Sequence, residues 1–546
     1  MNGLLATAHL KSSLSEAPRH NRRSNGSRLP HIASPRPSLF NVLRKVLRFS
    51  TTGSALIFCV LGCPLGLVFA DPLGTIDPTQ SVDWAQGAIN HAQQMRSFKD
   101  ADKGSQPSPG AIPEFSAAPD PSGQIATFQP EGSTAEGSNA FFQNLGTNGR
   151  TCFTCHQPQT GWTISAASAQ ARFDASSGAD PLFRLVDGAT CPTADVSTPA
   201  AKSQAYKLLI KKGLIRIGLA LPTTNLQFEV SKVDDPYNCT TSKDTGLQNK
   251  KSGIMSMYRR PLPSTNLGFL TAIMWDGREP SLAHQSVDAT LIHAQADPSS
   301  PPTAGEQGQI VAFETGTFTA QQFDNVAGDL TAGNAKGGPV ALSKEIANFF
   351  VGVNDPVGQN PKGLPFDPNI FDLYLLPMSE HLRSINRGEQ IFNGTQINIT
   401  GVAGLNDVLN QATIPGFCGT CHDTPNVGNH SVKAPLNIGI ANAGANKPPA
   451  VDISGLPVFT LRCTSGPNAG QVFVVTDPGR AMITGNCADI GKVKGPILRG
   501  LAARAPYFHN GSAATLMDVV NFYDQRFGIG FTSDQKQDLV NFLNAL

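Results

Sequence analysis

The sequence is short of charge and has no excess of either sign. Charged residues make up only 15% of the 546, and 42 Lys and Arg against 41 Asp and Glu leave a net charge of +1. This balance gives no electrostatic basis for a nucleic-acid partner, so we expect none. Hydrophobic residues reach 40%, enough for folding, while 53 glycines and 41 prolines favour a loop-rich chain in which cofactors replace part of the usual core.

Long apolar runs are also scarce, because residues 54–70 form the only one. A basic flank before this run and Ala70 at its end are typical of a secretory signal, so we predict that residues 1–70 are a targeting segment cleaved after Ala70. The length of the segment suggests a true start nearer Val42. Two alternatives stay open: lipid attachment at Cys63, and a membrane anchor, for which about 17 residues is the lower limit.

Ten cysteines are present, and four of them fall in two copies of one motif, Cys152-Phe-Thr-Cys155-His156 and Cys418-Gly-Thr-Cys421-His422. Cys-x-x-Cys-His is the attachment signature of a c-type haem. Two thiols three positions apart can both reach one porphyrin edge and add to its vinyl groups. The histidine that follows can then bind the iron through a neutral imidazole nitrogen. We therefore predict two covalently bound haem c groups, with His156 and His422 as iron ligands.

One rival metal site uses the same cysteines. A zinc ion held by four thiolates from both pairs would leave the histidine after each pair without a task, so we favour haem. Four other cysteines fall into two local pairs, Cys191 with Cys239 and Cys463 with Cys487, which an oxidising compartment would join as disulfides. Four buried thiols are the alternative. Haem attachment and cysteine pairing both indicate a location outside the cytoplasm, and we expect the periplasm.

The repeated motif predicts a mainly α chain, built from two tandem c-type cytochrome domains with strand-containing insertions and long loops. An internal repeat supports the duplication, because residues 259–282 resemble residues 492–516 in their prolines, glycines and spacing. The segments we predict are an N-terminal extension at 71–136, a first cytochrome domain at 137–375 with an insertion at 177–262, and a second cytochrome domain at 376–546.

Local patterns add detail to this plan. Alternating residues at 215–222 and 226–233 favour strands within the insertion. Glycine, alanine and threonine at 300–345 suggest a loop or linker. The runs that begin at Ser512 and Thr532 each start with a capping residue and show apolar residues at helical spacing, so two helices should end the chain.

The chain resembles the bacterial dihaem cytochrome c peroxidases and their relative MauG, the dihaem enzyme that matures methylamine dehydrogenase. The resemblance rests on the two haem motifs, on Trp275-Asp-Gly-Arg278 with Gln285, and on Leu498-Arg499 leading to Pro506-Tyr-Phe-His-Asn-Gly511. It covers most of residues 137–546, although not the insertions.

The resemblance implies a division of labour between the haems. The haem on His156 would react with peroxide, the haem on His422 would relay electrons, and Trp275 would lie between them. In this family the second axial ligand to the relay haem comes from a position that Tyr523 occupies in this chain. That position is a tyrosine in MauG and a methionine in electron-transferring peroxidases. A core aromatic is the other interpretation of Tyr523, and Met517 is an alternative ligand.

The reactive site departs from the family at one position. A glutamate usually stands twenty residues after the tryptophan, but here the residue is Gln295. Peroxide cleavage needs an acid/base group near the open iron face, which an amide cannot supply. His293 could act as that base, or could bind the iron and close it. We expect Gln285, His293 and Gln295 in the distal pocket.

These features predict a periplasmic dihaem oxidoreductase. It would reduce hydrogen peroxide with electrons from a small soluble donor, a cytochrome c or a cupredoxin, or use peroxide or oxygen to oxidise a substrate. A pure electron-transfer cytochrome is the alternative if His293 caps the first iron, and a dihaem oxygenase, as in rubber-cleaving enzymes, is a third. The resemblance also leaves open a calcium ion between the domains and a homodimer.

Overall fold

The computed structural model describes residues 110–546 except 240–246, 250–252, 350–368, 376 and 426–434. The predicted targeting segment and most of the predicted extension lie outside the described residues. All described residues belong to one compact unit, Phe69–Leu546, so the division into domains at residue 375 stays a prediction. No helix in the described part of the chain is long and apolar enough to cross a membrane.

The helices of the described residues are short, and many begin at a Ser or Thr whose side chain caps the first turn. The α-helices are α2 Ala166–Ser176, α3 Pro199–Ala205, α4 Lys207–Lys212, α5 Leu282–His293, α6 Ala304–Gly316, α7 Gly338–Glu345, α8 Glu380–Gly394, α9 Cys418–Cys421, α10 Ala481–Thr484, α11 Leu516–Phe527 and α12 Ser533–Asn544. The 3-10 turns are η2 Ala140–Phe142, η3 Cys152–Thr154, η4 Pro158–Thr160, η6 Leu267–Phe269, η7 Ala332–Asn334, η8 Gly444–Asn446, η9 Cys487–Asp489 and η10 Leu501–Arg504. The two predicted C-terminal helices are therefore confirmed as α11 and α12.

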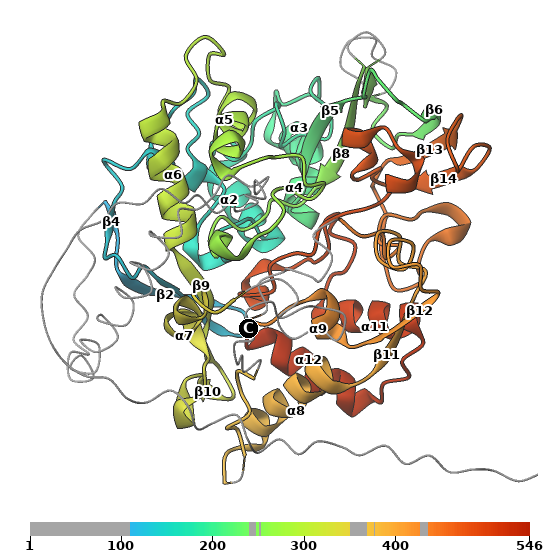
Figure 1. Ribbon diagram of the computed structural model, residues 1–546. Helices are drawn as coiled ribbons and strands as arrows, with labels where there is room; N and C mark the ends of the chain where they lie inside the picture. Colours follow the sequence, from blue (N-terminus) through green and yellow to red (C-terminus); the bar gives the residue numbers. More distant parts are fainter. Residues whose placement is uncertain (1–109, 240–246, 250–252, 350–368, 376, 426–434) are drawn as a thin grey trace, which may run out of the picture. The chain divides into compact units, whose positions relative to one another are not determined.

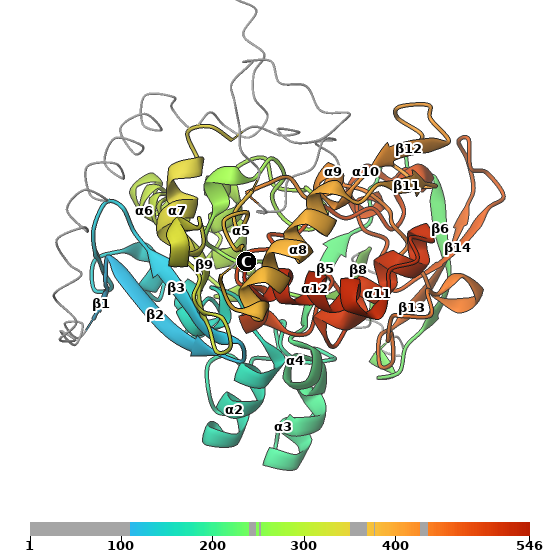
Figure 2. The ribbon, with the colours of Figure 1, turned by 90° about the horizontal axis from the view of Figure 1, so that it is seen from below.

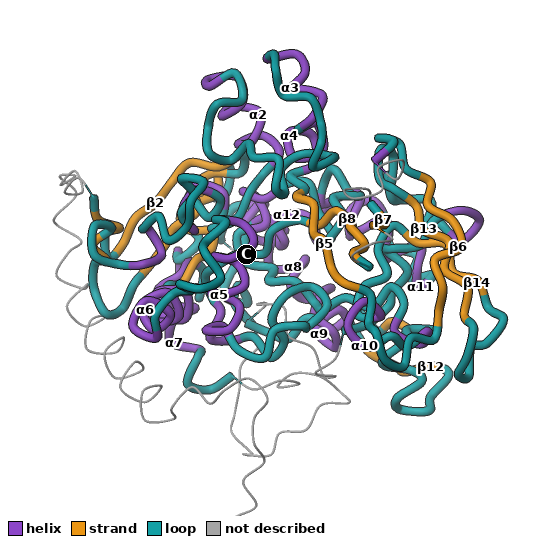
Figure 3. Tube along the Cα trace, turned by 90° about the horizontal axis from the view of Figure 1, so that it is seen from above, coloured by secondary structure: helices purple, strands orange, loops and turns teal. Residues whose placement is uncertain are grey.

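Strands form five small sheets in the described residues, so the expectation of a mainly α chain holds only in part. The strands are β1 Ala111–Ile112, β2 Phe115–Asp120, β3 Gly123–Phe128, β4 Thr134–Ala135, β5 Ile215–Ala220, β6 Phe228–Asp234, β7 Gln248–Asn249, β8 Ile254–Arg259, β9 Phe318–Asp324, β10 Gly328–Asp329, β11 Ile397–Thr400, β12 Thr413–Gly416, β13 Val458–Cys463 and β14 Val472–Val475. Figure 3 shows them distributed among the helices rather than gathered in one layer.

The largest sheet has the order β10-β9-β3-β2 and is antiparallel throughout. The loop or linker that we expected at 300–345 was wrong, because that range contains α6, β9, β10 and α7. The signal was present in the sequence, since Thr303 and Glu306 form a capping box at the start of α6. The helix and strand pattern was not recognised, because glycine and alanine contribute little to a hydrophobic periodicity.

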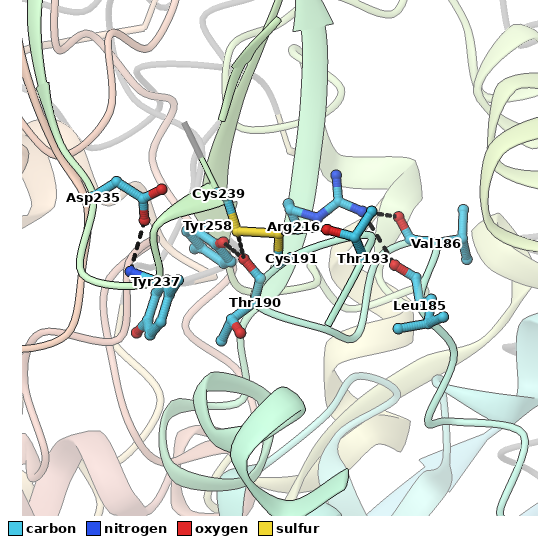
Figure 4. Close-up of a disulfide and its surroundings, with 10 residues drawn as sticks. All are labelled: Leu185, Val186, Thr190, Cys191, Thr193, Arg216, Asp235, Tyr237, Cys239 and Tyr258. Atoms are coloured by element: carbon cyan, nitrogen blue, oxygen red, sulfur yellow. Dashed lines mark hydrogen bonds between the residues drawn. A yellow bond between two sulfur atoms is a disulfide. The ribbon is translucent and has the colours of Figure 1, made fainter. Parts of the chain in front are cut away.

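The insertion contains the predicted strands and connects distant segments. Strands β5 and β6 cover the two alternating runs, and β6 pairs with β13, whose sequence lies more than two hundred residues later. Strands β6, β13 and β14 lie together at one end of Figure 3. Both predicted disulfides form. Cys463–Cys487 starts at the last residue of β13. Cys191–Cys239 lies next to Tyr258, whose hydroxyl donates to the carbonyl of Thr190 (Figure 4).

Helices α8 and α12 pack side by side near the second motif (Figures 1 and 2). Their contact depends on Gly388, since a Cβ atom there would lie 2.0 Å from the backbone oxygen of Asp538. Ser384 Oγ and Arg387 Nε fix the same aspartate at 2.5 and 2.8 Å. A glycine at the crossing therefore allows two backbones to approach more closely than any side chain would permit.

Candidate haem and redox site

The first cysteine motif folds as one tight turn. Thr151 caps the turn η3 and accepts a hydrogen bond from the Thr154 amide at 3.2 Å. The amide of His156 then donates to the carbonyl of Cys152 at 3.0 Å. This local winding places Cys152, Cys155 and His156 on the wall of one cavity, which is the arrangement that covalent haem attachment requires.

The imidazole of His156 is prepared for metal binding. Its Nδ1 donates to the backbone oxygen of Trp162 at 2.7 Å, so Nε2 is the nitrogen with a free lone pair. Burial lowers the pKa of His156 to about 4, which keeps the ring neutral, as an iron ligand must be. Trp162 itself is buried and donates from Nε1 to Thr127 Oγ1 at 2.8 Å. It holds the ligand through its carbonyl, a role that the sequence did not reveal.

The first cavity collects most of the predicted distal residues. Gln285, His293 and Trp275 line it together with the motif residues. Gln295 does not, because the chain turns at positive φ (55°) after α5 and leaves Gln295 exposed. Its Oε1 accepts from the amide of Asn148 at 3.2 Å. The structure therefore does not place Gln295 in the distal pocket.

His293 is held in one orientation by two buried charges. Its Nδ1 lies 2.7 Å from Oδ2 of Asp187, and Asp187 is bound by Arg150 at 2.7 Å. Burial opposes the charge of Asp187, but Arg150 and His293 outweigh it and lower the pKa of this carboxylate. A carboxylate can only accept here, so the proton is on Nδ1 and Nε2 is the free nitrogen. Neither Asp187 nor Arg150 was predicted, because both are distant from His293 in the sequence.

A buried carboxyl group also lines the first cavity. Glu314, on α6, is 6% exposed, and its Oε2 has no hydrogen-bond partner. Burial raises the pKa of Glu314 to about 8, so the group is protonated at neutral pH. Glu314 therefore shares the first cavity with Cys152.

The second motif forms the single-turn helix α9, and its histidine faces Tyr523 from α11. The distance from His422 Nε2 to the tyrosine hydroxyl is 3.3 Å. Burial lowers the pKa of His422 to about 4 and raises the pKa of Tyr523 far above its ordinary value. Met517, the alternative ligand, does not line this cavity, although Val519, Val520 and Tyr523 do. The geometry therefore favours Tyr523 over Met517.

Both cavities suit a large apolar prosthetic group. Each is lined by two cysteines and a neutral histidine among mostly apolar side chains. The donor set therefore fits a haem c in each cavity.

Trp275 stands between the two cavities. It lines both, together with the segment Arg260–Pro263. Its Nε1 donates to the Arg260 carbonyl at 2.7 Å, and its own carbonyl accepts from the amide of Lys494 at 2.7 Å. The neighbouring Asp276 is fixed by the buried guanidinium of Arg259. Trp275 is thus anchored at both ends in the shared wall, where a bridging role would require it.

The zinc alternative does not fit this arrangement. The two cysteine pairs line separate cavities, so they cannot share one ion. Within the described ranges, the metal-like cluster is a different one, made of Glu279, His284 and Asp288. Two of its members already pair, because His284 Nδ1 lies 2.7 Å from Glu279 Oε2.

Comparison with known proteins agrees with the haem interpretation. The family described as RoxA-like, cytochrome c-like matches residues 493–528. The cytochrome-c peroxidase IdrP2 of Denitromonas iodatirespirans is 36% identical over 141 residues, which cover 24% of this chain and 36% of the relative. Cytochrome c551 peroxidase of Nitrosomonas europaea is 26% identical over 254 residues, covering 44% and 66%.

The chain thus spans between about a third and two thirds of the length of these curated relatives. Among solved structures, a MauG-like protein associated with microbial copper homeostasis aligns with 53% of this chain and 73% of its own, at 17% identity and a TM-score of 0.25.

Proposed function

Because the chain belongs to the dihaem cytochrome c peroxidase and MauG-like family, we propose that it is a periplasmic enzyme that carries two haem c groups and reduces hydrogen peroxide. The observation that carries this proposal is the first cavity, where His156, Gln285 and an oriented His293 line one space. Electrons would come from a small soluble donor, a cytochrome c or a cupredoxin. If the enzyme instead uses peroxide or oxygen to oxidise another substrate, that reaction would take place at the same site.

The residues divide the work as follows. A haem bound in the first cavity would supply a redox-active iron, which His156 would hold through Nε2. His293, with its proton fixed on Nδ1 by Asp187, uses Nε2 to accept and return a proton on the peroxide oxygens. Gln285 supplies an amide that can donate to the same oxygens. Reduction of one peroxide to two waters consumes two protons and two electrons, and the side chain of His293, 27% exposed, can exchange protons with solvent.

The second cavity would hold the relay haem. His422 and Tyr523, whose Nε2 and hydroxyl lie 3.3 Å apart on the wall of this cavity, are the residues that would hold its iron. Tyr523, with an anionic oxygen once it binds iron, favours the ferric and higher oxidation states. Trp275, in the wall that both cavities share, is the residue through which electrons would pass.

Exchange of one histidine tests the proposal. In the haem-loaded protein, His293→Ala should lower peroxide-dependent oxidation of a reduced cytochrome c by about 10²–10⁴-fold, the usual contribution of a general acid/base. His284→Ala is the matched control, because His284 lies on the same helix with its side chain 57% exposed and should leave the rate unchanged. A haem-loaded wild type that turns over no peroxide with any donor would exclude the peroxidase.

An electron carrier is the second candidate, because His293 lines the same cavity as His156 and could bind the same iron. The ferric EPR spectrum separates the two functions. A high-spin signal supports catalysis, whereas two low-spin signals in every redox state support a carrier. Oxygen uptake with hydrophobic substrates would identify an oxygenase instead.

A further inference from the structure

Three buried cations line the second cavity. Arg260, Lys494 and Arg504 are 6%, 3% and 7% exposed, so water scarcely reaches them. Arg504 donates to the carbonyls of Gly500 and Ile497, and Arg260 donates from Nη2 to that of Ile164. Lys494 Nζ has only a long contact of 3.4 Å to a carbonyl, and Arg260 Nη1 has no partner. Their hydrogen bonds therefore involve neutral groups.

Among the described residues, no carboxylate balances these charges. None of the three forms an ion pair there, and the described residues that line the cavity include no Asp or Glu. The cations also repel one another, because burial followed by the charge of Arg504 lowers the pKa of Lys494 to about 7 and that of Arg260 to about 9. Buried charges are stable in proteins when they are paired, so a cluster of like charges indicates a missing anion.

We propose that Arg260, Lys494 and Arg504 form the anion site for the carboxylates of the prosthetic group in the second cavity. This inference rests on the proposed function, since it assumes that a haem occupies this cavity. A haem c is apolar except for two propionate carboxylates, and the cavity has the same division, with an apolar lining and one cationic part. Arginine and lysine are the residues that hold such groups by charge-assisted hydrogen bonds.

The same residues hold the bridging tryptophan. The carbonyl of Arg260 accepts from Trp275 Nε1, and the amide of Lys494 donates to the Trp275 carbonyl, each at 2.7 Å. Arg260 also lines the first cavity. Binding of the carboxylates would therefore fix the backbone on both sides of Trp275. The cation cluster thus couples haem binding in the second cavity to the position of Trp275, which lies between the two cavities.

Redox titration of the haem-loaded protein tests the assignment. A nearby positive charge favours the reduced iron, so Lys494→Gln and Arg504→Gln should each lower the midpoint potential of one haem, and the double variant should lower it further. Arg504→Lys keeps the charge and should stay near the wild-type potential. Arg499→Gln is the matched control, since Arg499 is also a buried cation, at 3% exposure, but lies outside the lining and donates from Nε to the carbonyl of Pro425.

The outcomes separate cleanly. Unchanged potentials in both glutamine variants, or an equal shift in Arg499→Gln, would overturn the proposal. If a glutamine variant loses a haem, retention by Arg504→Lys supports the anion site, and loss from that variant too contradicts it. These potentials are measured without peroxide, so a protein that shows the shifts but no turnover would contradict the proposed enzyme while leaving the anion site intact.

Discussion

The crossing of α8 and α12 allows a sharp test of packing. An alanine at Gly388 would bring its Cβ to 2.0 Å from the backbone oxygen of Asp538 and 2.7 Å from Cβ of Phe542. Neither is the end of a flexible side chain, so the helices must move apart. Overpacking costs about 1–3 kcal/mol, and so severe an overlap belongs near the upper limit.

Helix propensity acts in the opposite direction, since alanine is favoured over glycine by about 1 kcal/mol within a helix. The net expectation for Gly388→Ala is a loss of about 2 kcal/mol in the free energy of unfolding. Gly308→Ala is the matched control, because Gly308 lies inside α6, is exposed, and leaves room for a Cβ atom that would meet nothing within 4 Å. It should gain up to about 1 kcal/mol.

Urea unfolding of the haem-loaded variants, followed by circular dichroism, measures both changes. The difference between the two alanine variants should be about 3 kcal/mol. If Gly388→Ala proves as stable as the wild type, then α8 and α12 do not cross as closely as described. Equal changes in both variants would show that propensity alone governs them.

Three further predictions concern the sites. Asp187→Asn should cost about 3–5 kcal/mol of stability, because Arg150 keeps a buried charge without its partner, and peroxide turnover should fall; wild-type stability would contradict the pairing. Since the pKa of Asp187 is lowered on folding, its stabilising effect should be lost as pH falls through that lowered value. Tyr523→Phe should change the optical and EPR spectra of one ferric haem, whereas Met517→Leu should not, and an unaltered Tyr523→Phe spectrum would exclude the ligand. The pKa of Glu314 is raised from 4.5 to about 8, so the native state binds this proton more tightly than the unfolded chain. Stability should decline as pH rises toward 8, and Glu314→Gln should remove that part of the decline in urea titrations at a series of pH values.

Residues that are close in sequence were predicted well. The C-terminal helices α11 and α12 follow from local spacing, and the two disulfides follow from pairing neighbouring cysteines along the chain; the structure agrees with both. The sheet formed by β3 and β9 was missed, because its strands are nearly two hundred residues apart and β9 follows a run of small residues. Pairing of that kind leaves no periodic signal in either strand alone.

The chain by itself determined which chemistry is present, because a haem attachment motif needs only five consecutive residues wound into one turn. Tertiary structure alone decided how those residues are used. It brought Asp187 to His293, turned Gln295 outward, set Tyr523 opposite His422, and gathered three buried cations at one cavity. Each of these depends on contacts between segments distant in sequence, where burial and charge, rather than local spacing, fix the properties of a side chain.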